Sequence, residues 1–156
     1  MKRDANLVPL SRQHFRALVL CMRIHRKRAP RSILQREMLE LYAEDVRFHF
    51  QAEEEYLFPA ARRLAVAAPL VRELLGEHKK LRRAFAAARR RTLKSEEMVR
   101  FADLLEGHIR KEERQLFQEC QKQMSEKELD DIGKRMGKYF QKCGAAAQAA
   151  CKLPAR

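Results

Sequence analysis

The sequence predicts an all-α fold, an up-down-up-down four-helix bundle with an additional C-terminal helix. Val, Ile and Thr, the residues that favour strands, number eleven among 156. Residues of high helix propensity, chiefly Ala, Leu, Glu, Lys and Arg, fill most other positions. Apolar residues recur at helical spacing in five stretches, which proline and serine residues separate. A chain of this length suits one domain with a single core.

The five predicted helices span residues 11–28, 32–58, 70–91, 95–124 and 125–143. Serines are the expected N-caps of four of them: Ser11, Ser32, Ser95 and Ser125. The first four helices have the lengths and connections of the bundle. The fifth has an apolar stripe, so we expect it to pack across one end or one side of the bundle. The predicted domain is residues 1–144, with a bundle core at 10–117, and residues 145–156 form a C-terminal tail.

Composition argues against a membrane or secreted protein. The longest apolar run, Ala17–Met22, is far shorter than the roughly 20 residues of a membrane span. No apolar stretch typical of a signal peptide follows the basic N-terminus before Pro9. The four cysteines form no C-x-x-C pair, which argues against zinc-knuckle and thioredoxin-like sites. We therefore expect a soluble cytoplasmic protein with no membrane partner.

A net charge of +13 raises the alternative of a basic helical module that binds nucleic acid or another protein. The densest basic tracts are residues 25–28 and 79–94. Apolar residues interrupt the second tract on a helix, and no aromatic side chain is placed to stack on bases. A solvated basic face is therefore the better interpretation, and nucleic acid is not the expected partner.

Four of the five histidines lie on the predicted inward stripes, one on each bundle helix. They are His14, His49, His78 and His108. A buried imidazole needs hydrogen-bond partners, so four of them facing one another would be costly without a shared role. Glu53 and Glu112 each follow a histidine by four residues, which places them one turn further on the same helix face.

These histidine–glutamate pairs belong to a repeat. Residues 49–58 and 108–117 share the pattern H-x-x-x-E-E-x-x-L-F, and a lone histidine precedes each copy by 35 or 30 residues. The chain thus resembles two similar helical hairpins, which suggests a dinuclear centre. Four imidazoles and two carboxylates suit iron, with Glu53 and Glu112 shared between two ions. A mononuclear site, or a buried polar network without metal, remains the alternative.

Ferritin-like iron oxidation or storage is a third possible function. Ferritin-like di-iron sites use E-x-x-H, with the glutamate three residues before the histidine. The residues at that position before His49, His78 and His108 are Val46, Leu75 and Leu105. The order of the motif therefore disfavours this alternative.

The motifs resemble those of the hemerythrin-like, or HHE cation-binding, domains. The resemblance covers residues 10–117 and rests on L-x-x-x-H-F around His14, HFQAEEEYLFP, EHKKL around His78, and HIRKEERQLF. It implies a four-helix bundle with a carboxylate-bridged pair of non-haem irons, completed by an oxo or hydroxo bridge. The four histidines become terminal ligands and Glu53 and Glu112 become bridges. Dioxygen, nitric oxide or peroxide is the implied partner, and a role in iron handling or a catalytic activity stays open.

Two positions depart from classical oxygen carriers of that family. Arg82 stands where those carriers have a further histidine, and a guanidinium does not ligate metal. We expect Arg82 to extend outward or to pair with a carboxylate. The carriers also place the last bridge five residues after its histidine, which would select Glu113, but the internal repeat favours Glu112. Glu54 and Glu113 are expected to be solvated or salt-bridged, and Asp45 is a candidate acceptor for an imidazole.

Overall fold

The structure is a computed structural model that describes residues 2–151, with side chains described for residues 2–144. The first bundle helix is α1 (Val8–His25), and the third is α5 (Ala68–Arg89). The second is continuous and consists of α2 (Arg31–Leu41), the π-helical η1 (Tyr42–Val46), α3 (Arg47–Ala52), the π-helical η2 (Glu53–Leu57) and α4 (Phe58–Ala61). The fourth consists of α6 (Ser95–Lys111), the π-helical η3 (Glu112–Leu116) and α7 (Phe117–Gln123), and α8 (Glu126–Cys151) follows.

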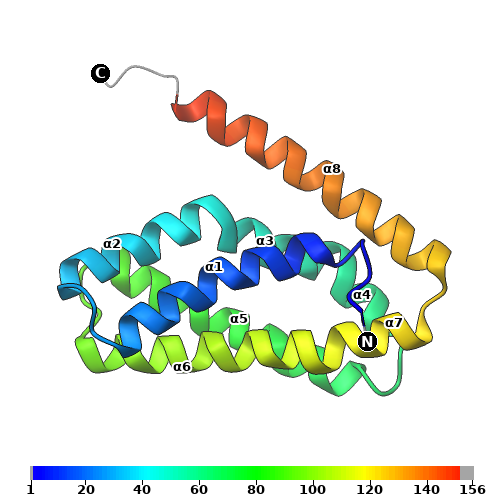
Figure 1. Ribbon diagram of the computed structural model, residues 1–156, viewed down its shortest axis with the longest axis horizontal. Helices are drawn as coiled ribbons and strands as arrows, with labels where there is room; N and C mark the ends of the chain where they lie inside the picture. Colours follow the sequence, from blue (N-terminus) through cyan, green and yellow to red (C-terminus); the bar gives the residue numbers. More distant parts are fainter. Residues whose placement is uncertain (1, 152–156) are drawn as a thin grey trace.

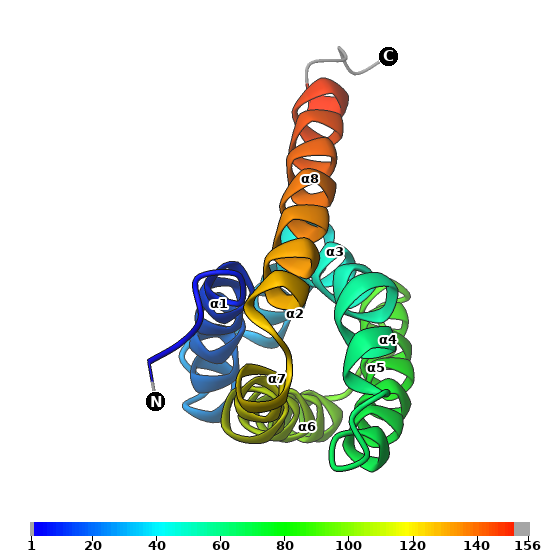
Figure 2. The same cartoon turned by 90° about the vertical axis from the view of Figure 1, so that its right-hand side faces the viewer.

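The predicted all-α bundle is confirmed. Four long helices run alternately up and down, and α8 leaves the end of the bundle at which α7 finishes (Figure 1). A view along the bundle shows α1, the α2–α4 helix, α5 and the α6–α7 helix around one common core (Figure 2). The described residues contain no strand, and none of their helices is long and apolar enough to cross a membrane.

Two helices end earlier in the sequence than predicted, and the α1–α2 and α5–α6 loops that follow them explain why. The predicted ends were residues 28 and 91, whereas α1 ends at His25 and α5 at Arg89. Lys27 and Arg91 have positive φ angles of 47° and 59°, a conformation that usually selects glycine at the end of a helix. The amides of Arg28 and Thr92 then close the paired hydrogen bonds of a Schellman motif with carbonyls five residues earlier. Without a glycine, the sequence carried no stop signal.

Of the four predicted N-caps, only Ser125 is confirmed. Its amide donates to the Glu128 carboxylate (3.0 Å), and the Glu128 amide donates to the Ser125 hydroxyl (3.3 Å), which is a complete capping box. The N-caps of α1, α2 and α6 are instead Leu7, Pro30 and Lys94. Helix α1 therefore begins three residues before Ser11, with Pro9 in its first turn, where a missing N–H has no cost.

The apolar core is divided into two clusters, one towards each end of the bundle. One cluster, around Met38, Phe85 and Phe101, lies on the side of the α1–α2 and α5–α6 loops. The other, around Phe58, Leu74 and Phe117, also includes the first turns of α8. The buried polar side chains of the predicted metal site lie between the two clusters.

Helix α8 packs on one side of the bundle through its first half, as its apolar stripe predicts. Leu129, Ile132 and Met136 are buried in the second core cluster, and the Tyr139 hydroxyl donates to Gln51 of α3 (2.8 Å). The helix then runs away from the bundle (Figure 1) and continues to Cys151, eight residues beyond the predicted end. Part of the predicted tail 145–156 is therefore helical, and its last residues, 152–156, lie outside the described residues.

Two glycines of α8 provide a matched test of this docking. A Cβ atom at Gly133 would lie 2.2–2.6 Å from the Asn6 side chain, whereas a Cβ at Gly137 would meet nothing within 4 Å. Gly137→Ala should raise the free energy of unfolding by about 0.5–1 kcal/mol, because alanine restricts the unfolded chain and favours the helix. Gly133→Ala should instead lower it, because the N-terminal segment must move. Chemical denaturation of both variants measures the difference, and equal effects would contradict the docking.

Candidate metal centre

The six predicted site residues meet in the middle of the bundle. His14 comes from α1, His49 from α3, His78 from α5 and His108 from α6, whereas Glu53 and Glu112 are the first residues of η2 and η3. All six are buried, and both carboxylates are 0% exposed. The fifth histidine, His25, lies elsewhere, at the end of α1 near the exposed Asp103 and the partly buried Glu106.

The donor atoms form two groups of four. His14 and His49 make one group and His78 and His108 the other, and both glutamates belong to both groups. The Nε2 atoms of His14 and His49 lie 3.0 Å apart, and those of His78 and His108 lie 3.1 Å apart. Within each group, one ligand atom from every residue lies within 4.8 Å of all the others. This arrangement matches the two-fold relation that the sequence repeat predicts.

Each carboxylate offers one oxygen to each group. Glu53 places Oε1 3.1 Å from Nε2 of His49 and Oε2 3.5 Å from Nε2 of His78. Glu112 places Oε1 3.2 Å from Nε2 of His108 and Oε2 3.1 Å from Nε2 of His14. A carboxylate whose two oxygens face two separate donor groups has the geometry of a bridging ligand.

The π turns that follow these glutamates bring the next aromatic residue of each repeat to the centre. A regular α-helix rotates by about 100° per residue, so a residue nine positions after His49 would point to the opposite side. A π turn takes up one additional residue and reduces this angle to about 80°. Phe58 is accordingly buried, with its ring centroid 5.4 Å from that of His78, and Phe117 lies 5.8 Å from His14.

Two sequence interpretations fail because a regular helix was assumed. Regular helical spacing from His49 predicts Tyr56, seven residues later, on the inward stripe of the helix 32–58, but Tyr56 is only partly buried, whereas Leu57 and Phe58 are buried. The predicted helix 32–58 ends before Pro59 because proline usually breaks a helix, but Pro59 lies within the observed helix, which continues to Ala61. The wider π turn before Pro59 accommodates the missing amide and the pyrrolidine ring.

The outer nitrogen of every imidazole has its own acceptor. Nδ1 of His14 donates to Glu113 (2.7 Å), and Nδ1 of His78 donates to Glu54 (2.7 Å). The remaining two Nδ1 atoms face Glu77 from His108 (3.0 Å) and Gln13 from His49 (2.9 Å). An ionised carboxylate only accepts, and the amide oxygen of Gln13 also accepts, so these contacts place a hydrogen on each Nδ1. Each Nε2 then faces the centre, where it can hold a proton or a metal cation.

The imidazole acceptors are the functional residues that sequence analysis missed. Glu54 and Glu113 are salt-bridged as expected, to Arg82 and Arg3, but each also holds a histidine of the other hairpin. Asp45 was the candidate acceptor, and it pairs with Arg16 instead. The acceptors lie on different helices from their histidines, so no spacing within one helix could reveal them.

Charge is strongly concentrated in this layer. Burial by itself would lower the pKa of His14, but contacts with Glu112 and Glu113 outweigh it and raise that pKa to about 9. The pKa of His108 likewise rises to about 10 against the effect of burial, chiefly because of Glu112 and Glu77. Burial opposes ionisation of Glu53 and Glu112, yet the imidazoles keep both carboxyl pKa values below normal. The layer therefore demands positive charge at its centre.

The donor set fits metal cations. No oxygen of Glu53 or Glu112 receives a hydrogen bond of acceptable geometry within the described residues, although all four are buried. The two Nε2 atoms of the first group also face each other at 3.0 Å, a contact that requires a proton or a metal cation between them. Two donors at right angles on a cation with bonds of about 2.1 Å lie about 3.0 Å apart. Two cations, one in each group, would satisfy every unpaired donor.

One comparison with known proteins identifies the family. The sequence model for the Hemerythrin HHE cation binding domain matches residues 9–120. No curated protein and no solved structure matches the chain. The matched segment covers most of the chain and contains all six converging residues. The protein therefore belongs to the hemerythrin HHE family of cation-binding domains.

Proposed function

We propose that the centre holds two iron ions and binds a small diatomic molecule, dioxygen or nitric oxide. His14 and His49 would hold one iron, His78 and His108 the other, and Glu53 and Glu112 would bridge them. The proposal rests on one observation: each carboxylate directs one oxygen towards one imidazole pair and its other oxygen towards the second pair. The mixed imidazole and carboxylate donors suit iron.

When bound, a pair of ferrous ions supplies electrons and open coordination positions for a diatomic ligand. The chain's own residues orient the four imidazoles through their Nδ1 acceptors and keep bulk water out of the layer. A narrow pocket that reaches His14, His49 and His108 has an otherwise largely apolar lining, which includes Ala17 and Leu105. A small apolar gas suits this lining better than a charged metabolite does.

Arg82 supports an open position at the centre. Its guanidinium donates to Glu54 (2.7 Å) and lies over the Phe50 ring at 5.4 Å, as the predicted pairing with a carboxylate requires. Glu54 in turn accepts from His78, so Arg82 acts on the site through that acceptor and supplies no ligand. Six protein residues then serve both metal positions.

Metal analysis tests the proposal directly. Full-length protein loaded anaerobically with ferrous iron and then exposed to air should retain about two irons per chain, one for each donor group. The visible absorption of the ferric protein should shift when azide is added. Loaded protein should also melt at a higher temperature than metal-free protein, because metal binding stabilises the folded state. Binding of zinc alone would contradict the proposal, and many irons per chain would favour ferritin-like storage.

Alanine substitutions of neighbouring glutamates distinguish residues that would bridge the two metals from residues that orient an imidazole. Glu53→Ala and Glu112→Ala should each remove one or both irons, because each removes donors from both groups. Glu54→Ala and Glu113→Ala should keep two irons but bind them about 10- to 100-fold more weakly, since an imidazole loses its acceptor. Iron content and competition with a chelator distinguish the outcomes. Loss of iron from Glu113→Ala with full retention in Glu112→Ala would move the bridge by one residue.

Two substitutions of Arg82 test the open position. Arg82→His places an imidazole one turn after His78, where it should add a ligand and weaken azide binding by roughly tenfold. Arg82→Gln removes the same charge, adds no such ligand and should leave azide affinity within about threefold of the parent protein. Absorption titrations with azide measure both. Equal azide affinities in the two variants would show that residue 82 does not reach the metal.

A further inference from the structure

The end of the bundle that carries the α1–α2 and α5–α6 loops bears a dense group of exposed cations. The first loop region holds Arg26, Lys27, Arg28 and Arg31, and four more cations lie within residues 89–94. None of the eight forms an ion pair within residues 2–144, although many other arginines do. The Gln35 side chain donates to the Leu93 carbonyl (2.8 Å), which ties the two loop regions together.

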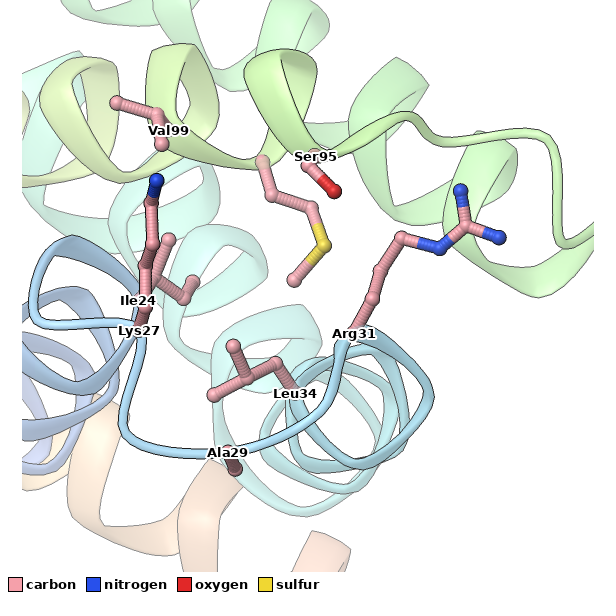
Figure 3. A pocket seen from close by; sticks show the side chains of 8 residues that line it. Ile24, Lys27, Ala29, Arg31, Leu34, Ser95 and Val99 are labelled. Atoms are coloured by element: carbon pink, nitrogen blue, oxygen red, sulfur yellow. The ribbon is translucent and has the colours of Figure 1, made fainter.

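A cavity of about 240 Å³ opens between these loops (Figure 3). Its interior is apolar and includes Ile24, Leu34, Met98 and Val99. Lys27 and Arg31 flank it on opposite sides, and the Ser95 hydroxyl lies between α6 and the open space (Figure 3). The cavity therefore combines an apolar interior with a cationic and hydroxyl-bearing mouth.

This combination favours one class of ligand. Cations alone would suit the phosphates of nucleic acid, but phosphate contacts would leave the apolar cavity unfilled. A simple anion would likewise gain nothing from the interior. A molecule with an anionic head and a short apolar chain uses both parts, with the chain out of water and the head near Lys27 and Arg31.

The volume of the cavity limits the length of the ligand's hydrocarbon chain. A water molecule occupies about 30 Å³ in the liquid, and a methylene group is of similar size. A cavity of 240 Å³ therefore accepts a chain of roughly six to eight carbons. It is smaller than the usual pockets for drug-sized ligands, which begin at about 300 Å³.

We propose that this end of the bundle binds a small amphipathic anion, a carboxylate or phosphate monoester with an unbranched chain of roughly six to eight carbons. The site is separate from the metal centre, because Ile24, Leu34 and Met98 belong to the apolar cluster on the loop side of the polar layer.

Calorimetric titration of the metal-loaded full chain tests the ligand class. Octanoate or octyl phosphate should bind, and the tighter of the two identifies the head group. Acetate and inorganic phosphate, which lack the chain, should bind at least roughly tenfold more weakly, and so should octyl glucoside, which lacks the charge. With carbon-13 methionine methyl labels, the ligand should shift Met98 and leave Met124 at the other end unchanged. Equal binding of octyl glucoside would overturn the proposal.

Paired variants test the location. Lys27→Gln with Arg31→Gln should weaken binding roughly tenfold, whereas Arg89→Gln with Arg90→Gln should change it less than about twofold. Ala29→Phe should abolish binding by filling the cavity without changing charge. All five positions lie at or near the surface, and thermal melting checks that each variant folds. Equal weakening by both charge pairs, or a single-stranded oligonucleotide that competes fully with octanoate, would show a general polyanion surface and overturn the proposal.

Discussion

The structure depends on one buried layer of four imidazoles and two carboxylates. Glu53 and Glu112 are fully buried, and the surrounding imidazoles hold their pKa values below normal, so both are anions in the middle of the bundle. Burying such charge is costly unless cations and directed donors compensate it. The layer divides the apolar core in two, and every bundle helix contributes a histidine to it. Cation binding and stability of the fold are therefore coupled.

The irregularities of the helices follow from this layer. His14 and Lys27 are separated by thirteen residues, as are His78 and Arg91, so the first helices of the two hairpins are equivalent. The second helix of the first hairpin carries five additional residues before His49. Five residues would rotate a regular α-helix by about 140°, but η1 takes up one of them and reduces the rotation to about 40°. The π turn thus keeps His49 directed towards its partners.

The convergence of the six candidate ligands could be predicted from the sequence because their geometry is local. A histidine and a glutamate four residues apart share a helix face whatever the rest of the chain does, and the repeat relates the two hairpins. The Nδ1 acceptors could not be predicted, because Glu54 and Glu113 hold histidines on other helices. The π turns and the left-handed Lys27 and Arg91 were missed for a different reason. No residue type marks a π turn, and a cation at a left-handed position carries no glycine signal.

The residues that accept from each imidazole Nδ1, together with their paired cations, determine the net charge around the centre. Three of the four imidazoles donate to a carboxylate that also pairs with a cation. The three series of contacts are His14–Glu113–Arg3, His78–Glu54–Arg82 and His108–Glu77–Lys111. His49 alone of the four donates to a neutral amide, Gln13. The surrounding carboxylates and cations therefore cancel, and Glu53 and Glu112 remain as the negative charge that protonated imidazoles or a bound cation must balance. A carboxylate acceptor makes an imidazole a stronger donor than an amide does. The group with His49 is consequently the more weakly donating of the two. Both of its histidines line the narrow apolar pocket, together with His108 of the other group.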